Sequence, residues 1–415
     1  MAGLAGLAVA LLVVGGTAAP AFAAGDPCGP GIFVRAPSSE PVTAAFGARS
    51  YGAGDVASLR VSVRAPTRGS LRIYHAGPGR RLRRLATFAA LERPARRVRL
   101  RASVRHINVR IGAWPSGLYF ALVQTPHGMA AAPFVLHPKR VRAKRVAVVV
   151  PTDTMAAYNL RDTDGDGYGN SWYADPHVQT VDLRRPFLSG PLPQWSGRFV
   201  HWFAHSGYSA DFYSDEDLNA VASGDRLASR YHLIVFAGHE EYVTQHVFTL
   251  VKRYRDLGGN LAFLSANNFY RRVTIAPPWM TCITQFRDLG EPEASLVGVQ
   301  YVDWWHRRYP SRPFVVRSVA AAPWLFRGTG LRPGDHFGRG YGIEIDARAR
   351  SSPPGTRVIA ELPSIFGPGK TAQMTYYRTR AGAKVFAAGA MYFDGPQSPA
   401  TARMLSNLWV HLRRR

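Results

Sequence analysis

Cysteine is nearly absent from this sequence. The 415 residues contain only Cys28 and Cys282, which are too few for a metal site built from cysteine thiolates. An oxidising compartment would permit a disulfide between them, but two thiols so far apart in the chain cannot be paired from the sequence, and the question stays open. No run of about 18 apolar residues follows the N-terminal segment, so the sequence predicts no membrane-spanning helix in the mature protein.

Acidic residues and lysine are also scarce. The chain has 52 Lys and Arg against 27 Asp and Glu, a formal net charge of +25, and only five of the basic residues are lysine. No stacking or recognition motif accompanies the charge, so the sequence does not favour a nucleic-acid partner. With 46% hydrophobic residues the composition is that of a folded protein. At roughly 100–200 residues per domain, the length predicts two or three domains.

The first two dozen residues indicate export. The apolar run Leu4 to Val14 is followed by small residues that end in Ala21-Phe22-Ala23. An apolar run too short to span a bilayer, followed by an A-x-A-like site, is typical of a cleavable signal peptide. We therefore expect residues 1–23 to be removed and the protein to be secreted or held in the cell envelope, outside the cytoplasm. The usual basic residues before the run are missing, which indicates a start site placed slightly too late. An uncleaved membrane anchor is the alternative.

Residues 24–137 have the texture of an immunoglobulin-like β-sandwich. Short β-branched or aromatic runs alternate with Gly and Pro turns at the spacing of such a fold. In Val98 to Arg101 apolar and basic residues alternate, which places arginine on the solvated face of a strand. Residues 138–145 form a basic linker. Two interpretations of the arginines remain open, a solvated sheet face or a surface for an anionic cell-wall polymer.

Residues 146–415 show the alternation of buried strands and helices that predicts an α/β domain with a mainly parallel sheet. The expected strands and helices are Arg145 to Val150, Phe199 to Ser206, Tyr208 to Tyr213, His232 to Ala237, Thr244 to Asp256, Asn260 to Ser265, Lys384 to Ala388 and Thr401 to Arg413. Ligands of such sheets bind beyond the carboxyl ends of the strands, so the residues that follow these strands are the candidates for function.

The strand that ends at Ala237 is followed by a histidine and two carboxylates, His239, Glu240 and Glu241. At the functional edge of a sheet, such groups suit acid-base chemistry or metal binding. A structural interpretation is equally open on local sequence, in which Glu241 caps the helix beginning near Thr244 and His239 is a turn residue. Asn267 follows the next strand in the same way.

A series of short blocks resembles the C-terminal domain of the large subunit of N,N-dimethylformamidase, over about Val146 to the C-terminus. The blocks are Ala157-Tyr158-Asn159, Arg185-Pro186-Phe187, Ala237 to Tyr242, Asn260 to Asn267, Gly340 to Asp346, Thr375 to Thr379 and Gly382 to Gly389.

The resemblance implies a glutamine-amidotransferase-like α/β fold and an iron ion bound by two tyrosines and one glutamate. It assigns Tyr158 and Glu241 as metal ligands and His239 and Glu344 as the neighbouring acid-base groups. The second tyrosine corresponds to Phe187, which has no oxygen to bind a metal. That ligand is therefore missing unless another tyrosine replaces it, and the candidates are Tyr168, Tyr173 and Tyr213.

The expected function is metal-assisted hydrolysis of an amide C–N bond in a small molecule, outside the cytoplasm. A hard cation prefers phenolate and carboxylate oxygens and can polarise an amide carbonyl. The alternative is a non-catalytic envelope protein with a degenerate metal site, which Phe187 favours.

A second motif, Asp162, Asp164 and Asp166 before Gly167, matches the opening of an EF-hand-type calcium loop. Position twelve, where a bidentate glutamate is expected, is Tyr173, so a complete EF-hand is excluded and Asp175 substitutes only in part. A structural calcium loop and an acidic turn without an ion both remain open.

Overall fold

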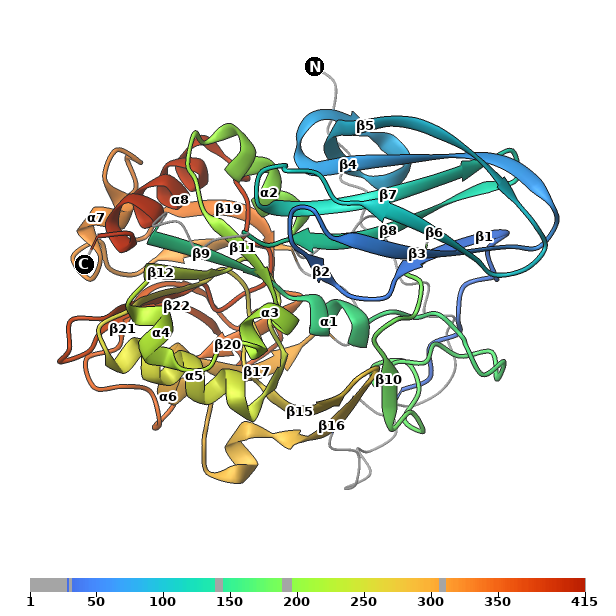
Figure 1. The fold of residues 1–415 in the computed structure, drawn as a ribbon. Helices are drawn as coiled ribbons and strands as arrows, with labels where there is room; N and C mark the ends of the chain where they lie inside the picture. The colour runs from blue at the N-terminus through green and yellow to red at the C-terminus, as the bar shows by residue number, and fades with distance from the viewer. Residues whose placement is uncertain (1–27, 30–31, 139–144, 189–195, 306–310, 415) are drawn as a thin grey trace, which may run out of the picture.

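The computed structural model describes residues 28–29, 32–138, 145–188, 196–305 and 311–414, which form a β-sandwich beside a larger α/β part (Figure 1). The expected signal peptide and residues 139–144 of the basic linker lie outside the described residues. Within the described residues, no helix has the length and apolar character needed to cross a membrane.

Residues 42–136 form two facing sheets. The smaller has the order β1-β3-β6, with β1 at Val42–Phe46, β3 at Val56–Val63 and β6 at Arg105–Arg110. The larger has the order β2-β8-β7-β4-β5, with β2 at Ser50–Tyr51, β8 at Gly128–Leu136, β7 at Gly117–Thr125, β4 at Thr67–Leu82 and β5 at Thr87–Leu100. Leu59 and Val61 of one sheet pack with Tyr119 and Phe134 of the other, so the core lies between the sheets.

Apolar and basic residues alternate in β5, and this alternation places its arginines on the solvated side of the strand. Val98 and Leu100 are buried, whereas Arg97 and Arg99 are exposed. The prediction that arginine lies on the solvated side of this strand is therefore confirmed.

The outer face of the larger sheet packs against the α/β part. Phe120 and Leu122 of β7 share one apolar cluster with Val148 and Phe212 of the second part. Helix α2 (Gly197–His205) also covers this face, and the ring of His201 stacks on Phe88 of β5 with centroids 3.8 Å apart. The two parts therefore share a continuous core.

The second part is built on a nine-stranded sheet. Its order is β11-β9-β12-β14-β23-β22-β21-β18-β19. The strands are β9 (Arg145–Val150), β11 (Asp211–Ser214), β12 (Tyr231–Phe236), β14 (Asn260–Phe263), β18 (Arg312–Val316), β19 (His336–Tyr341), β21 (Arg357–Leu362), β22 (Ala372–Arg378) and β23 (Lys384–Ala387). The first five strands in the sheet are parallel and the remaining pairs are antiparallel.

The expected mainly parallel sheet is thus correct for one half only, and the sheet as a whole is mixed. Successive strands β21, β22 and β23 are neighbours joined by turns, and the turn after β21 contains Gly367-Pro368-Gly369. Antiparallel neighbours need only such short connections, whereas parallel neighbours need a crossover.

Helices cover both faces of the nine-stranded sheet. In β9, Val148 and Val150 belong to the cluster beneath α8, whereas Ala147 and Val149 belong to the cluster beneath α5. Besides α2, the α-helices of this part are α1 (Thr152–Ala157), α3 (Asp215–Asn219), α4 (Gly224–Ala228), α5 (Gln245–Asp256), α6 (Ala294–Val297), α7 (Pro323–Phe326) and α8 (Pro399–Leu412).

Two smaller sheets border the carboxyl ends of the parallel strands. One has the order β10-β16-β15-β13, with β10 at Thr180–Asp182, β13 at Tyr242–Thr244, β15 at Arg271–Ala276 and β16 at Trp279–Gln285. The other pairs β17 (Gln300–Trp304) with β20 (Glu344–Ala347). Cys28 and Cys282 form a disulfide that joins the N-terminal segment to β16.

Candidate active site

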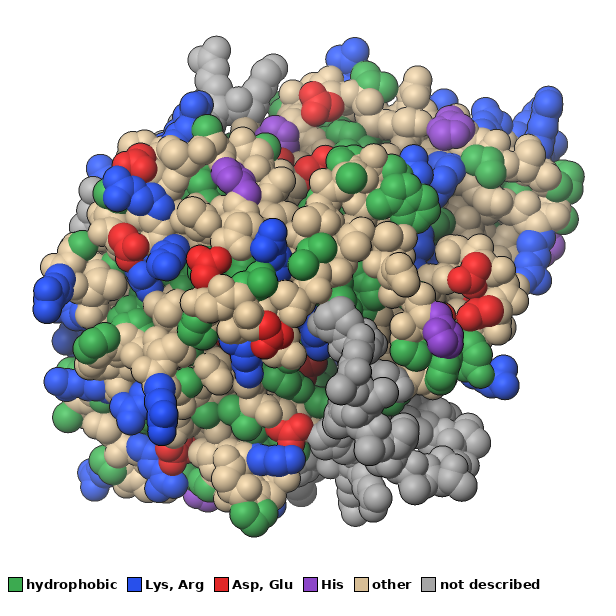
Figure 2. Space-filling model, turned by 90° about the horizontal axis from the view of Figure 1, so that it is seen from below, with side chains coloured by type: hydrophobic (Ala, Val, Ile, Leu, Met, Phe, Trp, Pro, Cys, Tyr) green, Lys and Arg blue, Asp and Glu red, His purple; other side chains and the backbone are tan. Residues whose placement is uncertain are grey.

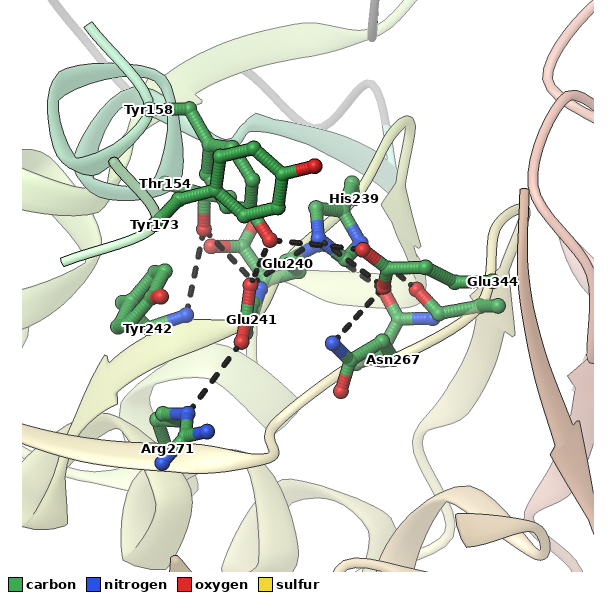
Figure 3. A network of polar contacts seen from close by, with 12 residues as sticks. Thr154, Tyr158, Tyr173, His239, Glu240, Glu241, Tyr242, Asn267, Arg271 and Glu344 are labelled. Atoms are coloured by element: carbon green, nitrogen blue, oxygen red, sulfur yellow. Dashed lines mark hydrogen bonds and ion pairs between the residues drawn. The ribbon is translucent and has the colours of Figure 1, made fainter. Parts of the chain in front are cut away.

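Four residues far apart in the chain converge beyond the carboxyl ends of β9, β12 and β14 (Figure 3). Tyr158 caps the C-terminus of α1, which follows β9 directly. His239 and Glu241 follow β12, and Glu344 is the first residue of β20. Because β9 and β12 are parallel neighbours, the segments that follow them leave the sheet at the same edge.

Tyr158 joins the two carboxylates. Its Oη donates to Oε2 of Glu241 at 2.7 Å and lies 3.4 Å from Oε1 of Glu344. Burial, followed by the charges of these two carboxylates, raises the pKa of the Tyr158 phenol well above its usual value. In the metal-free protein the phenol therefore holds its proton at neutral pH.

His239 is a buried cation between the same two carboxylates. Its Nδ1 lies 2.9 Å from the carbonyl oxygen of Ala266, an acceptor, so Nδ1 carries a proton. Its Nε2 lies 3.2 Å from Oε2 of Glu241 and 3.5 Å from Oε2 of Glu344. Burial acts to lower the pKa of His239, but the neighbouring charge of Glu344 and the hydrogen bond to Glu241 outweigh it and raise the pKa to about 9.

Asn267 orients Glu344. Its Nδ2 donates to Oε2 of Glu344 at 2.8 Å, and its backbone N–H donates to the carboxylate of Asp346 at 2.8 and 2.9 Å. The backbone of Asn267 has a φ of 54°, a left-handed conformation that asparagine tolerates better than most residues. Burial raises the pKa of Glu344, while the charge of His239 opposes this effect.

Thr154 and Arg271 support Glu241. Thr154 Oγ1 accepts hydrogen bonds from the backbone N–H groups of Glu241 and Tyr242 at 3.0 and 3.2 Å. Arg271 Nε lies 3.6 Å from Oε1 of Glu241. The carboxylate therefore has a cation on one oxygen and Tyr158 with His239 on the other.

The sequence-based site residues Tyr158, His239, Glu241 and Glu344 thus lie together. The prediction that Glu241 caps α5 is wrong, because Thr244 caps α5 with its own side chain, which accepts from the N–H of Val247. Asn267 was noted as a strand-end residue but was not assigned to the site. Thr154 was missed, although its place just after β9 was an available signal.

Phe187 supplies no ligand atom, although its block is bonded to the segment that follows Tyr158. The carbonyl of Pro186 accepts from the side chains of Asn159 and Arg161, which fixes this block next to the Tyr158 segment. The ring of Phe187 packs against the main apolar cluster.

Of the three tyrosines considered as replacements, only Tyr173 reaches the site. Its ring lies 5.4 Å from that of Tyr158, and the two point into the same space in Figure 3. Burial, followed by the charge of Glu344, raises the pKa of Tyr173 to about 12. Tyr168 instead packs on Phe33, and Tyr213 shares a hydrogen bond with Tyr231.

The oxygen donors fit a hard metal ion in part. With metal–oxygen distances of about 2.0–2.1 Å, two adjacent octahedral ligands lie about 2.9 Å apart, close to the 2.7 Å between Tyr158 Oη and Glu241 Oε2. Tyr173 adds a second phenol beside them, and the buried Oδ1 of Asn267 has no hydrogen-bond partner among the described residues. The ligand atoms of His239, Glu241 and Glu344, however, do not all lie as close to one another as those of Asp162, Asp164 and Asp166.

That aspartate group forms the predicted loop. One oxygen from each of Asp162, Asp164 and Asp166 lies within 4.8 Å of the others. The loop also satisfies itself in part, because Asp162 accepts from the N–H groups of Gly165 and Gly167 at 2.6 and 3.0 Å. The geometry is compatible with both predicted interpretations.

Comparison with known proteins gives one informative match. A sequence model described as N,N-dimethylformamidase beta subunit-like, C-terminal, matches residues 104–398, well over half of the chain. No curated protein matches. Among solved structures, a superoxide reductase (neelaredoxin) from Ignicoccus hospitalis is 14% identical, with 24% of this chain and 81% of that chain covered and a TM-score of 0.16. A carbohydrate acetylesterase from Xanthomonas citri is 10% identical, with coverages of 55% and 60% and a TM-score of 0.18. At these TM-scores neither structure supports an argument.

Proposed function

Because the chain belongs to the N,N-dimethylformamidase beta subunit-like family, we propose that it is an exported, metal-assisted hydrolase of an amide C–N bond in a small molecule. The observation that carries this proposal is the meeting of Tyr158, His239, Glu241 and Glu344 at one strand-end edge. No finding supports the alternative of a non-catalytic envelope protein.

Tyr158 and Glu241 would hold the metal ion, with Tyr173 in place of the tyrosine that Phe187 lacks. Iron is the proposed metal, because phenolate and carboxylate are hard donors. When bound, the ion would polarise the amide carbonyl and lower the pKa of a coordinated water. Tyr158 and Tyr173 would have to release their protons to bind it, so the raised pKa values make metal binding weaker at low pH.

His239 and Glu344 are proposed as the proton-transfer pair. His239 is held protonated by two carboxylates, so its Nε2–H is a donor for the developing oxyanion or for the leaving amine. Glu344 is fixed by Asn267, and its carboxylate would serve as the base for the proton of an attacking water. The two groups lie 3.5 Å apart, so the proton that Glu344 accepts can return through His239 to the leaving nitrogen.

A small amide would approach from the side of the half-buried aromatic residues. His239 and Glu241 are almost fully buried, whereas Tyr158, Tyr173 and Trp304 are only half-buried. The ring of Tyr173 meets that of Trp304 at 6.0 Å, so these side chains form an apolar border for the substrate.

Metal analysis and amide hydrolysis of the purified protein test the proposal. We expect about one iron per chain and ammonia or amine release from a panel of formamide, acetamide and their N-methyl derivatives. Glu241→Gln should lose most of the metal and at least about 100-fold in activity. The matched control is Glu361→Gln. Glu361 lies on β21, pairs with Arg317 and takes no part in the site. Metal-free wild-type protein, or equal activity in both variants, would contradict the proposal.

Export requires a separate test. The sequence of residues 1–23 supports removal of a signal peptide. Mass spectrometry of protein recovered from the growth medium and envelope fractions should give a mature N-terminus near residue 24. Recovery of the intact N-terminus from the cytoplasm alone would refute export.

A further inference from the structure

A cavity of about 830 Å³ lies on the β-sandwich, between the β4–β5 hairpin and strands β7 and β8. We call it the hairpin cavity. Its lining comes only from residues 72–129, so it shares no residue with the candidate active site. Binding there would use none of the residues assigned to amide chemistry above.

The floor of the hairpin cavity is apolar. Tyr74, Leu85 and Leu122 line it and are buried, and the half-buried Met129 lies beside them. These residues belong to the sheet face that elsewhere packs against the α/β part. The cavity therefore continues an apolar packing surface into a concave region that is open to an apolar ligand.

The rim of the cavity is strongly basic. Arg80, Arg83 and Arg84 line it, and all three are exposed. Between Thr67 and Leu100 the hairpin carries ten arginines against a single acidic residue, Glu92. No hydrogen bond or ion pair joins the side chains of Arg80, Arg83 and Arg84 to another described residue. Their charges are therefore available to an anion.

A fourth arginine is fixed in place. Nη1 of Arg72 donates to Ser70 Oγ at 3.2 Å and also to Oε1 of Gln124, which itself lines the cavity. Both bonds use the same nitrogen, so Nε and Nη2 of this half-buried guanidinium keep their donors. A guanidinium held by neutral acceptors, and ion-paired to no carboxylate among the described residues, is pre-organised for an external anion.

We propose that the hairpin cavity binds a monomeric alkyl phosphate, with its chain on the apolar floor and its phosphate between the rim arginines and Arg72. Arginine recognises phosphate oxygens through paired N–H donors, and each CH₂ group of the chain that leaves water adds to the affinity. Neither feature alone explains the cavity, because an inorganic anion would leave the floor uncovered and an uncharged alkane would leave the arginines unpaired.

The test is isothermal titration calorimetry of the full chain with three probes, namely octyl phosphate, octanol and inorganic phosphate. We expect octyl phosphate to bind at least about tenfold more tightly than either of the others, and its affinity to fall with added salt. Equal binding of inorganic phosphate and octyl phosphate would overturn the amphiphile assignment, and no binding of octyl phosphate would overturn the site.

Paired charge variants locate the binding. Arg83→Ser with Arg84→Ser should weaken octyl phosphate binding at least about tenfold. The matched control is Arg97→Ser with Arg99→Ser, which removes the same charge from exposed positions of β5 that do not line the cavity. All four side chains are exposed, so both double variants should fold, as circular dichroism can check. Equal weakening in both would show a diffuse charge effect and overturn the proposal.

Discussion

The phenol oxygen of Tyr158 lies 2.7 Å from Oε2 of Glu241, although 83 positions separate the two residues in the chain. The contact exists because β9 and β12 are parallel neighbours, and the segments that follow them leave the sheet at one edge. Thr154 strengthens the link, since its hydroxyl in α1 accepts from the backbone of Glu241.

If Tyr158 and Tyr173 both bind the metal, removing either phenol should release it. We expect Tyr158→Phe and Tyr173→Phe each to lose the visible phenolate-to-iron absorption in part and about 10–100-fold in metal affinity. Tyr213→Phe is the control, because that hydroxyl bonds to Tyr231 away from the site. Metal titration followed by absorption spectroscopy measures both effects. An unchanged spectrum in Tyr173→Phe would remove Tyr173 from the ligand set.

Asn267 can be tested without disturbing the backbone. Asn267→Gly removes the amide that holds Glu344, while glycine adopts the φ of 54° without strain. We expect kcat to fall about tenfold or more and the basic group in the pH–rate profile to shift, with KM little changed. Asn267→Ala should lose activity similarly and also lower the melting temperature, because alanine is strained at positive φ. A Gly variant with full kcat would show that Asn267 does not position Glu344.

Much of the frame around the site could be predicted from the sequence. The buried runs ending at Val150 and Phe236 and the helix before Asp256 are set by local hydrophobic period, and they lie within one or two residues of their predicted places. The strand-end rule then placed His239 and Glu241 at the functional edge.

The rest depended on contacts between distant segments. The antiparallel half of the large sheet was missed because pairing direction depends on tertiary partners rather than on local period. The support that Asp346 gives to Asn267 joins residues 79 positions apart, and no local pattern reports it. Tyr173 was one of three candidate tyrosines, and only its position near Tyr158 separates it from the others.

Asp394 should make stability depend on pH. Burial raises the pKa of this carboxyl from 3.8 to about 7, and the charge of Arg198, which also lies over the Tyr392 ring, opposes the rise. The folded-state pKa of Asp394 exceeds its unfolded value, so folding favours the protonated carboxyl. Its contribution to the free energy of unfolding is therefore complete below about pH 4 and is lost as the pH rises through 7. Asp394→Asn removes this loss, so the variant should melt higher than the wild type at pH 8 and almost equally at pH 4.

The shift of about three pKa units sets an upper limit of about 4 kcal/mol on the difference at pH 8. Calorimetry of both proteins from pH 4 to pH 8 measures it. The exposed Asp225→Asn, whose carboxylate pairs with Arg253, is the control and should not show this rise with pH. A wild-type and variant difference that is flat with pH would mean that Asp394 is charged throughout in the folded protein.

Calcium should stabilise the protein only if the Asp162, Asp164 and Asp166 loop binds it. At about 1 mM calcium and a dissociation constant of about 0.1–1 mM, typical of extracellular sites, binding adds about 0.4–1.4 kcal/mol and raises the melting temperature by about 1–3 °C. Asp164→Asn with Asp166→Asn should abolish the rise, because both side chains are exposed ligand candidates. Magnesium, which demands tighter octahedral geometry, should give a smaller shift.

The internal bonds from Asp162 to Gly165 and Gly167 persist in the double variant, so its melting temperature in chelator should stay near that of the wild type. An equal calcium response in both proteins would mean that the aspartates form a turn without an ion.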